Sequence, residues 1–350
     1  MRGGNFMKLI KPEQLKAGDL VATVSLSWGG AGDPDLLWRY KLGKKRLEEV
    51  FGVSVIEMEH TLKGSEYIYK HPEARAKDLM DAFKNPDIKA IFSCIGGDDS
   101  IRILPYIDFD VIRKNPKIFI GYSDSTITHL ICYKAGLTSF YGPSVLAEFA
   151  ENIKIFDYTT EYINKALFGN NPIGLIPATE KWTGDRIEWT EDNRNTSKTM
   201  RENLGYEFLQ GSGIVEGRLF GGCIEVLEMA KGTKLWPDEP VFDDAILFFE
   251  TSEETPHPDN LLYWLRNYAA QGILQKARAI LFGKPYQEKY YNEYKEVIKA
   301  IVDENNLHST PIVYNMTFGH NEPMCILPYG ALAEVNCEDK TFSILESGVF

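Results

Sequence analysis

The chain has 350 residues, of which 44% are hydrophobic and 25% are charged, and its formal net charge is −12 at pH 7. The length predicts two domains, and the composition excludes a disordered or fibrous protein. The acidic charge argues against a nucleic-acid partner, since a duplex binder needs a basic surface to neutralise phosphates.

Cysteine usage and the N-terminal stretch indicate where the protein works. The five cysteines are scattered and form neither a CxxC pair nor a Cys/His spacing suited to zinc, so we expect a reducing cytosol and no metal site. The first residues contain no apolar signal segment, and no run reaches the roughly 18 apolar residues of a membrane helix. We therefore expect a cytoplasmic protein with no membrane partner. Met7 offers an alternative start, in which case the six residues before it are dispensable.

From residue 18 onward, short apolar runs alternate with helical patterns. Strands are expected within 19–27, 54–60, 88–97 and 117–124, and helices over 35–51, 72–84, from 99, over 126–133 and over 159–168. This alternation predicts βαβ units and a mainly parallel sheet, that is, an α/β fold. Such sheets place their chemistry in loops at the carboxyl ends of the strands.

The segment 179–203 differs from its surroundings, because it is polar and dense in charge yet contains Trp182, Ile187 and Trp189. It is too polar for a buried element, so we expect a long loop between domains. Beyond it, short runs rich in glycine and β-branched residues, with one clear helix at 258–272, predict a smaller β-rich or barrel-like domain. The expected division is an N-terminal α/β domain at 1–178, an interdomain loop or lid at 179–212 and a C-terminal β-rich domain at 213–350.

A serine lies at the corner between a strand and a helix, in Gly121-Tyr122-Ser123-Asp124-Ser125. Such a corner pushes the side chain outward and aims the next backbone N–H toward the helix N-terminus, so Ser123 has the geometry of a nucleophile. The G-x-S-x-G elbow of α/β-hydrolases is incomplete here, which weakens assignment to that fold. The alternative is that Ser123, Asp124 or Ser125 simply caps the helix.

The preceding strand ends in Gly96 and Gly97, within the motif IGGDD. Two glycines allow the backbone to approach a ligand closely or to form a tight turn, and the residues alone leave both interpretations open. The motif is neither a P-loop nor GxGxxG, and its two acids would repel phosphate.

A serine nucleophile needs a base, and His320 is the best candidate among six histidines. It lies in a loop between Gly319 and Pro323, after an apolar run, where a scaffold can hold a functional side chain. His129 is nearly two turns away from Ser123 on the same helix and is expected to be a packed or otherwise satisfied residue. The others are expected at the surface: His60, His71, His257 and His308.

The base in turn needs an acid that orients it, and Glu250 ends an otherwise continuously apolar strand in ILFFETSEE. A carboxylate there must be exposed at the sheet edge or partnered, because burying it unpaired costs several kcal/mol. Glu253 and Glu254 follow in the loop, where exposure to solvent is enough to account for two acidic residues.

Several of these motifs together resemble a known family. GYSDST, IGGDD, residues 202–223, ILFFETSEE and FGHNEP resemble, in order and spacing, the LD-carboxypeptidase family of serine peptidases, and within it the branch of microcin C immunity peptidases. The resemblance extends over nearly the whole chain. It implies a flavodoxin-like N-terminal domain, a small β-rich C-terminal domain, an active site between them, a homodimer, and no metal or organic cofactor.

The resemblance also implies roles for individual residues. Ser123 matches the nucleophile, Glu250 the acid of the triad and His320 the general base. The backbone amides of Gly97 and Asp124 match the oxyanion hole.

The family contains two substrate classes. Murein LD-carboxypeptidases release D-alanine from an L-centre of meso-diaminopimelate, whereas the microcin C immunity branch cleaves the amide joining aspartate or glutamate to an adenylate or its sulfamoyl analogue. IGGDD and the tryptophan-bearing loop resemble the second branch, so we expect an aminoacyl or peptidyl nucleotide as substrate. The alternatives are a murein peptidase and a non-catalytic protein that binds a nucleotide or peptide.

Three further residues are candidates for the substrate pocket: Trp182, Trp189 and Cys223. Either tryptophan can stack on adenine, and the alternative for each is that it only pins the loop to the protein. The chain has Gly221-Gly222-Cys223 where many relatives have Gly-Gly-Asn, so Cys223 takes the place of the asparagine. This difference makes the substrate specificity of this chain an open question.

Overall fold

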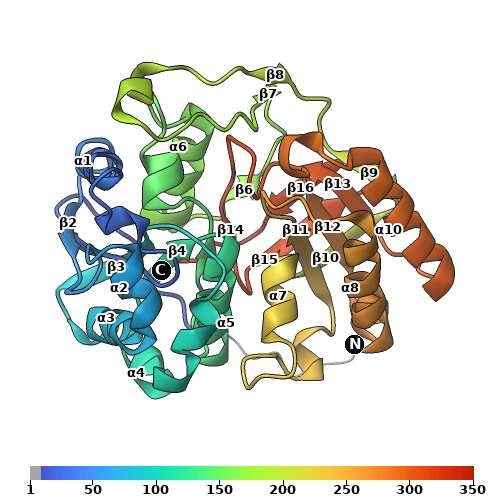
Figure 1. The fold of residues 1–350 in the computed structure, drawn as a ribbon. Coiled ribbons are helices and arrows are strands. Elements are labelled where there is room, and N and C mark those ends of the chain that lie inside the picture. The colour runs from blue at the N-terminus through green and yellow to red at the C-terminus, as the bar shows by residue number, and fades with distance from the viewer. Residues whose placement is uncertain (1–8) are drawn as a thin grey trace.

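The computed structural model describes residues 9–350, so the question of Met7 as an alternative start lies outside the described residues. Figure 1 shows two α/β halves side by side, with a long segment passing over both. Among the described residues, no helix is long and apolar enough to cross a membrane.

The N-terminal half is built on a six-stranded sheet of order β14-β5-β4-β3-β1-β2. Its strands are β1 (Leu20–Val24), β2 (Ser54–Glu57), β3 (Ile88–Ser93), β4 (Ile118–Gly121), β5 (Phe140–Tyr141) and β14 (Leu327–Pro328). The first five strands run parallel in the order 2-1-3-4-5, which confirms the predicted flavodoxin-like domain. β14 pairs antiparallel with β5, so a piece of the C-terminal chain completes this sheet.

Helices cover both faces of this sheet in Figure 1, and their starts and ends follow local chemistry. They are α1 (Leu37–Phe51), α2 (Ser65–Lys70), α3 (Pro72–Lys84), α4 (Phe109–Lys114), α5 (Thr126–Lys134) and α6 (Asp157–Ile163). Gly52 ends α1 in the left-handed conformation that glycine adopts readily, and Pro72 occupies the first turn of α3, where its missing N–H costs nothing. The helix expected from residue 99 is a 3-10 helix over Ser100–Tyr106.

The C-terminal half contains an eight-stranded mixed sheet of order β6-β16-β15-β10-β11-β12-β13-β9. Its strands are β6 (Gly174–Leu175), β9 (Glu207–Gln210), β10 (Ile214–Cys223), β11 (Ala245–Glu250), β12 (Ala279–Gly283), β13 (Ile312–Met316), β15 (Leu332–Asn336) and β16 (Thr341–Ile344). The central strands β10 to β13 are parallel and largely buried, which is why they read as continuous apolar runs.

The helices of this half are α7 (Ile224–Ala230), α8 (Pro258–Ala270), α9 (Ile273–Lys276) and α10 (Tyr291–Asn305). The expectation of one clear helix was therefore wrong. The buried residues of α10, namely Tyr294, Ile298, Ile301 and Val302, follow helical spacing within a charged stretch and form a narrow apolar stripe.

The segment expected as an interdomain loop contains short strands. β7 (Lys181–Trp182) and β8 (Arg201–Glu202) pair antiparallel with each other, and β9 joins the C-terminal sheet beside β13. β6, which lies before the expected boundary at 178, also belongs to the C-terminal sheet. The chain therefore crosses between the halves more than once, and the division at 178 and 213 stays a prediction.

Candidate active site

Ser123 lies on a strained corner at the end of β4. Its φ is +60°, a left-handed conformation that a residue with a side chain adopts only where the surrounding structure imposes it. The glycine before the corner is required, since a Cβ on Gly121 would lie 2.6 Å from Ser125 Oγ. Such a strand–turn–helix corner presents Oγ outward.

The alternative that this serine cluster caps the helix is wrong for α5. No side chain accepts a hydrogen bond at that helix N-terminus. The carboxylate of Asp124 instead accepts from the Ser100 backbone N–H at 2.8 Å, and the hydroxyl of Ser125 donates to Ser93. Ser123 is therefore the one member of the cluster that faces the cleft.

The structure brings together the three side chains predicted from separate motifs. His320 Nε2 lies 3.0 Å from Ser123 Oγ, and His320 Nδ1 lies 2.7 Å from Glu250 Oε2. Glu250 ends β11 and is buried, as the partnered alternative for this carboxylate requires. Gly319 lets the histidine loop approach, because a Cβ there would lie 2.8 Å from Glu250 Oε2. The three side chains predicted as nucleophile, base and orienting acid thus form one chain of contacts.

Tyr141 completes this chain of contacts, and no motif in the sequence had pointed to it. Its hydroxyl donates to the second carboxylate oxygen of Glu250 and accepts from the Ser123 backbone N–H at 3.1 Å. A tyrosine on the short strand β5 reads as ordinary core, so only the fold reveals these two contacts.

The glycine loop after β3 packs against the nucleophile. A Cβ on Gly96 would lie 3.1 Å from Ser123 Oγ and 3.3 Å from the Asp124 backbone nitrogen. Gly97 has φ +144°, and a Cβ there would lie 2.3 Å from Ser27 Oγ. The loop therefore brings its backbone close to the nucleophile at a point where side chains would not fit.

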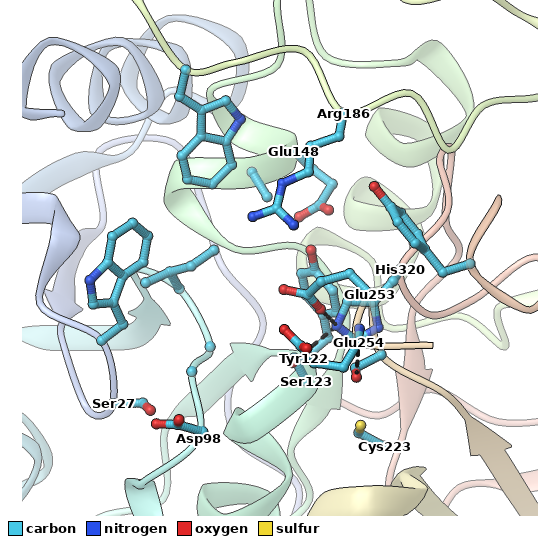
Figure 2. A pocket seen from close by; sticks show the side chains of 18 of the residues that line it. Ser27, Asp98, Tyr122, Ser123, Glu148, Arg186, Cys223, Glu253, Glu254 and His320 are labelled. Atoms are coloured by element: carbon cyan, nitrogen blue, oxygen red, sulfur yellow. Dashed lines mark hydrogen bonds and ion pairs between the residues drawn. The ribbon is translucent and has the colours of Figure 1, made fainter. Parts of the chain in front are cut away.

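Glu253 is a neighbour of the triad that sequence reasoning treated as solvated. Its Oε2 lies 3.0 Å from His320 Nε2, the nitrogen that also faces Ser123. Figure 2 shows these three side chains clustered together. The one available signal was position, since Glu253 comes directly after the carboxyl end of β11.

The charges around His320 change its protonation. Burial opposes a charge on the ring, but the attraction and hydrogen bond of Glu250, together with those of Glu253, outweigh it and hold the pKa of His320 well above its ordinary value. The hydrogen bond from His320 in turn lowers the pKa of Glu253 to about 2. Carboxylates thus lie at both ring nitrogens, an arrangement that favours the imidazolium form.

The remaining histidines lie away from this centre. His129 is fully buried in α5, where Nε2 lies 2.8 Å from the Gly121 carbonyl oxygen and Nδ1 lies 2.8 Å from Ser139 Oγ, as the packed alternative predicted. The surface prediction for His60 was wrong, because Asp78 binds both its ring and its backbone N–H and draws it inside. His71, His257 and His308 are at least partly exposed.

The triad opens into a cleft of about 1510 Å³ between the two halves. Trp189 and Cys223 line this cleft, and the guanidinium of Arg39 stacks on the Trp189 ring at 4.3 Å. Trp182 is buried outside the cleft lining, with Lys284 Nζ 4.2 Å from its ring centroid. This placement favours the interpretation that Trp182 pins the loop to the protein.

Arg186 was not singled out from the sequence. It lies on the segment 179–203 and reaches into the cleft on the side of Glu148 (Figure 2). Among residues 9–350 no carboxylate lies within ion-pair distance of its guanidinium, so this cation is available to a ligand.

Lys198 anchors the same segment over the cleft. Its Nζ lies 2.6 Å from Glu151 Oε2 and also binds Glu322, and both carboxylates are almost fully buried. Burial opposes the charge of Lys198, but the two carboxylates outweigh it and raise its pKa. Within the described part of the chain, no group of three or more His, Cys, Asp or Glu side chains is arranged to hold a metal ion.

Comparison with known proteins places this geometry in a family. The model of the LD-carboxypeptidase N-terminal domain matches residues 21–142, and that of the C-terminal domain matches residues 216–335. The microcin C7 self-immunity protein MccF of Escherichia coli is 32% identical over 276 residues, which cover 78% of each chain. The chain belongs to the LD-carboxypeptidase family.

Solved structures place this LD-carboxypeptidase relative in the MccF-like branch. An MccF-like protein from Streptococcus pneumoniae, solved in complex with AMP, superposes with a TM-score of 0.87 at 34% identity, over 93% of this chain and 98% of that one. MccF in complex with aspartyl sulfamoyl adenosine superposes with a TM-score of 0.84 at 29% identity, over 97% of this chain and 100% of that one. The chain is thus a serine-type hydrolase of the carboxypeptidase class, as predicted, with the predicted two-domain fold.

Proposed function

We propose that this enzyme hydrolyses the amide bond between an acidic amino acid, or a peptide ending in one, and an adenylate-type nucleotide. In this proposal Ser123 is the nucleophile, His320 the general base and Glu250 the acid that orients it. The observation that carries the proposal is the position of His320, with one ring nitrogen 3.0 Å from Ser123 Oγ and the other 2.7 Å from Glu250.

The reaction proceeds by acyl transfer. His320 Nε2 takes the hydroxyl proton of Ser123 as Oγ attacks the substrate carbonyl carbon, and it then gives this proton to the leaving nitrogen as the C–N bond breaks. A water molecule then attacks the resulting ester and passes a proton to His320. As the C–Oγ bond breaks, His320 returns this proton to Ser123 Oγ, which releases the amino acid and restores the serine. Glu250 accepts from Nδ1–H throughout and stabilises the transient imidazolium.

The negative oxygen of each tetrahedral intermediate needs donors that are fixed in advance. We assign this role to the backbone amides of Gly97 and Asp124, one on the glycine loop after β3 and one directly after the nucleophile. The support for this assignment is the close packing of that loop against the corner, where a Cβ on Gly96 would lie 3.1 Å from Ser123 Oγ and 3.3 Å from the Asp124 backbone nitrogen.

The substrate class rests on charge and on the family. Arg186, which has no ion pair among the described residues, can bind the carboxylate of an acidic side chain or the phosphate. Trp189 lines the cleft and offers its ring to adenine, whereas Trp182 stabilises the loop, and Cys223 forms the wall beside Glu250, its partner in the β10–β11 register. Similar proteins have been solved with AMP and with aspartyl sulfamoyl adenosine. The biological role we propose is self-immunity or detoxification of such compounds.

A mass-spectrometric hydrolysis assay tests this function. The two substrates are glutamyl sulfamoyl adenosine and a murein tetrapeptide that ends in D-alanine, and Ser123→Ala is the control. Cleavage of the nucleotide that is lost in Ser123→Ala supports the proposal, and release of D-alanine alone replaces it with cell-wall recycling. If neither compound is cleaved and a fluorophosphonate fails to label Ser123, the protein is a binder.

A further inference from the structure

The starting observation is that one nitrogen of His320 has two competing partners. Nε2 lies 3.0 Å from Ser123 Oγ and 3.0 Å from Glu253 Oε2. An ionised carboxylate only accepts hydrogen bonds, so a contact with Glu253 requires a proton on Nε2. Nδ1 already donates to Glu250 at 2.7 Å. A ring with carboxylates at both nitrogens carries two protons and cannot take a third from the serine.

The neighbours of His320 on every side favour this protonated state or leave it unchanged. Glu250 faces the ring from β11 and Glu253 from the loop after it, and both raise its affinity for a proton. The Tyr122 ring packs edge-on at 5.0 Å from the end of β4 and carries no charge at neutral pH, because burial raises its pKa. Arg186, on the segment over the cleft, acts on this group through its attraction for Glu253.

The structure leaves Glu253 free to move although its loop is fixed. The backbone N–H and the hydroxyl of Ser252 both donate to Glu225, at 2.9 and 2.7 Å, and the Glu254 N–H donates to the Ser252 hydroxyl. The side chain of Glu253 is 38% exposed, and among the described residues His320 is its one ion-pair partner. A change of rotamer is therefore enough to free Nε2.

The surroundings indicate what draws Glu253 away. Of the side chains that line the cleft, eleven are Asp or Glu and three are Arg or Lys, so the cleft favours a cation. Glu253 contacts the same His320 nitrogen that faces Ser123, so a group bound to its carboxylate lies close to the attacking oxygen. An α-nitrogen is about 2.5 Å from its own carbonyl carbon, which matches this position. A free α-ammonium group forms an ion pair with the carboxylate, whereas an acylated nitrogen is uncharged and offers a single N–H donor.

We propose that Glu253 is a specificity-determining residue. In the free enzyme its carboxylate accepts a hydrogen bond from His320 Nε2, and when substrate binds it leaves this nitrogen and binds the α-ammonium group of the substrate. The inference rests on the proposed function for the reaction and narrows its substrate class. The preferred substrates are aminoacyl nucleotides with a free α-amine, in preference to peptidyl or N-acylated ones. When Glu253 turns to such a substrate, His320 loses one of the two carboxylates that favour its protonated form, its Nε2 proton passes to solvent water, and the neutral ring can act as base.

The first experiment compares kcat/KM for glutamyl sulfamoyl adenosine and its N-acetyl derivative. The native enzyme should prefer the free amine by about tenfold or more, the effect of one buried charge pair. Glu253→Gln should reduce this preference to within about threefold. Glu254→Gln, on the same loop, should retain it. Equal preference in the native enzyme and Glu253→Gln would overturn the proposal.

The second experiment needs no substrate, so it separates this inference from the proposed function. The rate at which a fluorophosphonate labels Ser123 is measured from pH 5 to 9 in the native enzyme and Glu253→Gln. The midpoint of the native profile should lie about one pH unit or more above that of the variant, because the carboxylate no longer favours the imidazolium. Equal midpoints in the two proteins would show that Glu253 does not hold His320 in its protonated form. If neither nucleotide is hydrolysed but the midpoints differ, the proposed function fails and the block stands.

Discussion

In the proposed mechanism Ser123 and His320 act as a unit, and this determines what single substitutions should do. Ser123→Ala removes the attacking oxygen and should lower kcat by about 10⁴-fold or more, while His129→Ala should change it by less than about tenfold. The reason for the contrast is geometry, since His320 contacts Ser123 and His129 contacts the Gly121 carbonyl and Ser139. Steady-state kinetics on the nucleotide substrate measure both values. Equal losses would contradict the assignment of the base.

The pH dependence of the rate follows from the protonation of His320. A base must be neutral to act, and this ring holds its proton to a higher pH than an ordinary histidine because Glu250 and Glu253 outweigh its burial. Activity should therefore fall as the pH drops through a midpoint above the ordinary value of about 6.5. A profile of kcat/KM from pH 5 to 9 measures this midpoint. A flat profile would mean that chemistry does not limit the rate or that His320 is not the base.

Tyr141 is a positioning residue, because its hydroxyl touches Glu250 and the Ser123 backbone N–H. Tyr141→Phe should lower kcat by about 10- to 100-fold with a smaller change in KM. The reason is that Glu250 loses a hydrogen-bond donor and the backbone N–H of Ser123 loses its acceptor. Tyr329→Phe is the matched control, because it removes a buried hydroxyl that donates to the Gly221 carbonyl instead. The proposed role fails if both variants lose the same kcat.

At the scale of elements, Lys198 is a buried anchor of the segment 179–203, beside the contacts of Trp182. Lys198→Met leaves Glu151 and Glu322 without their cation, so the segment should lose its fixed position over the cleft. We expect KM for the nucleotide to rise by about tenfold, with a smaller effect on kcat, and faster proteolysis within 179–203.

Lys181→Met supplies the control for this anchor. Lys181 lies on the same segment but is exposed and pairs only with Glu202 across the β7–β8 ribbon. Surface pairs of this kind contribute about 0–1 kcal/mol, so KM and the proteolysis rate should stay close to native values. If Lys198→Met behaves like Lys181→Met, the segment is held by its other contacts.

At the scale of the whole molecule, His129 couples the pH to the stability of the fold. It lies at the junction of the halves, stacked on Tyr329 at 4.8 Å, and burial lowers its pKa to about 3. The unfolded chain takes up a proton near pH 6.5, and the folded chain does so only near 3. The contribution of neutral, buried His129 to the free energy of unfolding is thus fully present above pH 6.5. It falls by about 1.4 kcal/mol per pH unit as the pH drops from 6.5 toward 3.

Urea unfolding at pH 7 and pH 5 measures this effect, and His129→Gln isolates it from other titrating groups. The native protein should lose more stability between the two pH values than His129→Gln does, by about 1–2 kcal/mol. Equal losses would show that His129 is not the source of the pH dependence.

The homodimer stays a prediction. Light scattering tests it, since a monomer has a mass of 39.7 kDa and a dimer has twice that value.

The sequence by itself determined the local features of this protein. Alternating apolar runs and helical patterns predicted the strands β1 to β4 and their parallel arrangement, and Pro72 and Gly52 lie at helix ends, because these signals act within a few residues. The special positions of Ser123, Glu250 and His320 were also visible, since a polar residue at a strand end or a rigid loop stands out locally. Family resemblance then gave them joint roles.

The tertiary structure decided everything that depends on contacts between distant segments. Glu253 reads as a solvated loop acid, Tyr141 as core and His60 as surface, because their partners are far away or belong to another element. The two candidate tryptophans lie on the same segment, but Trp189 lines the cleft and Trp182 is buried outside it. Charge, burial and distance act through space, so a single chain read in order cannot determine which of its ionisable groups meet.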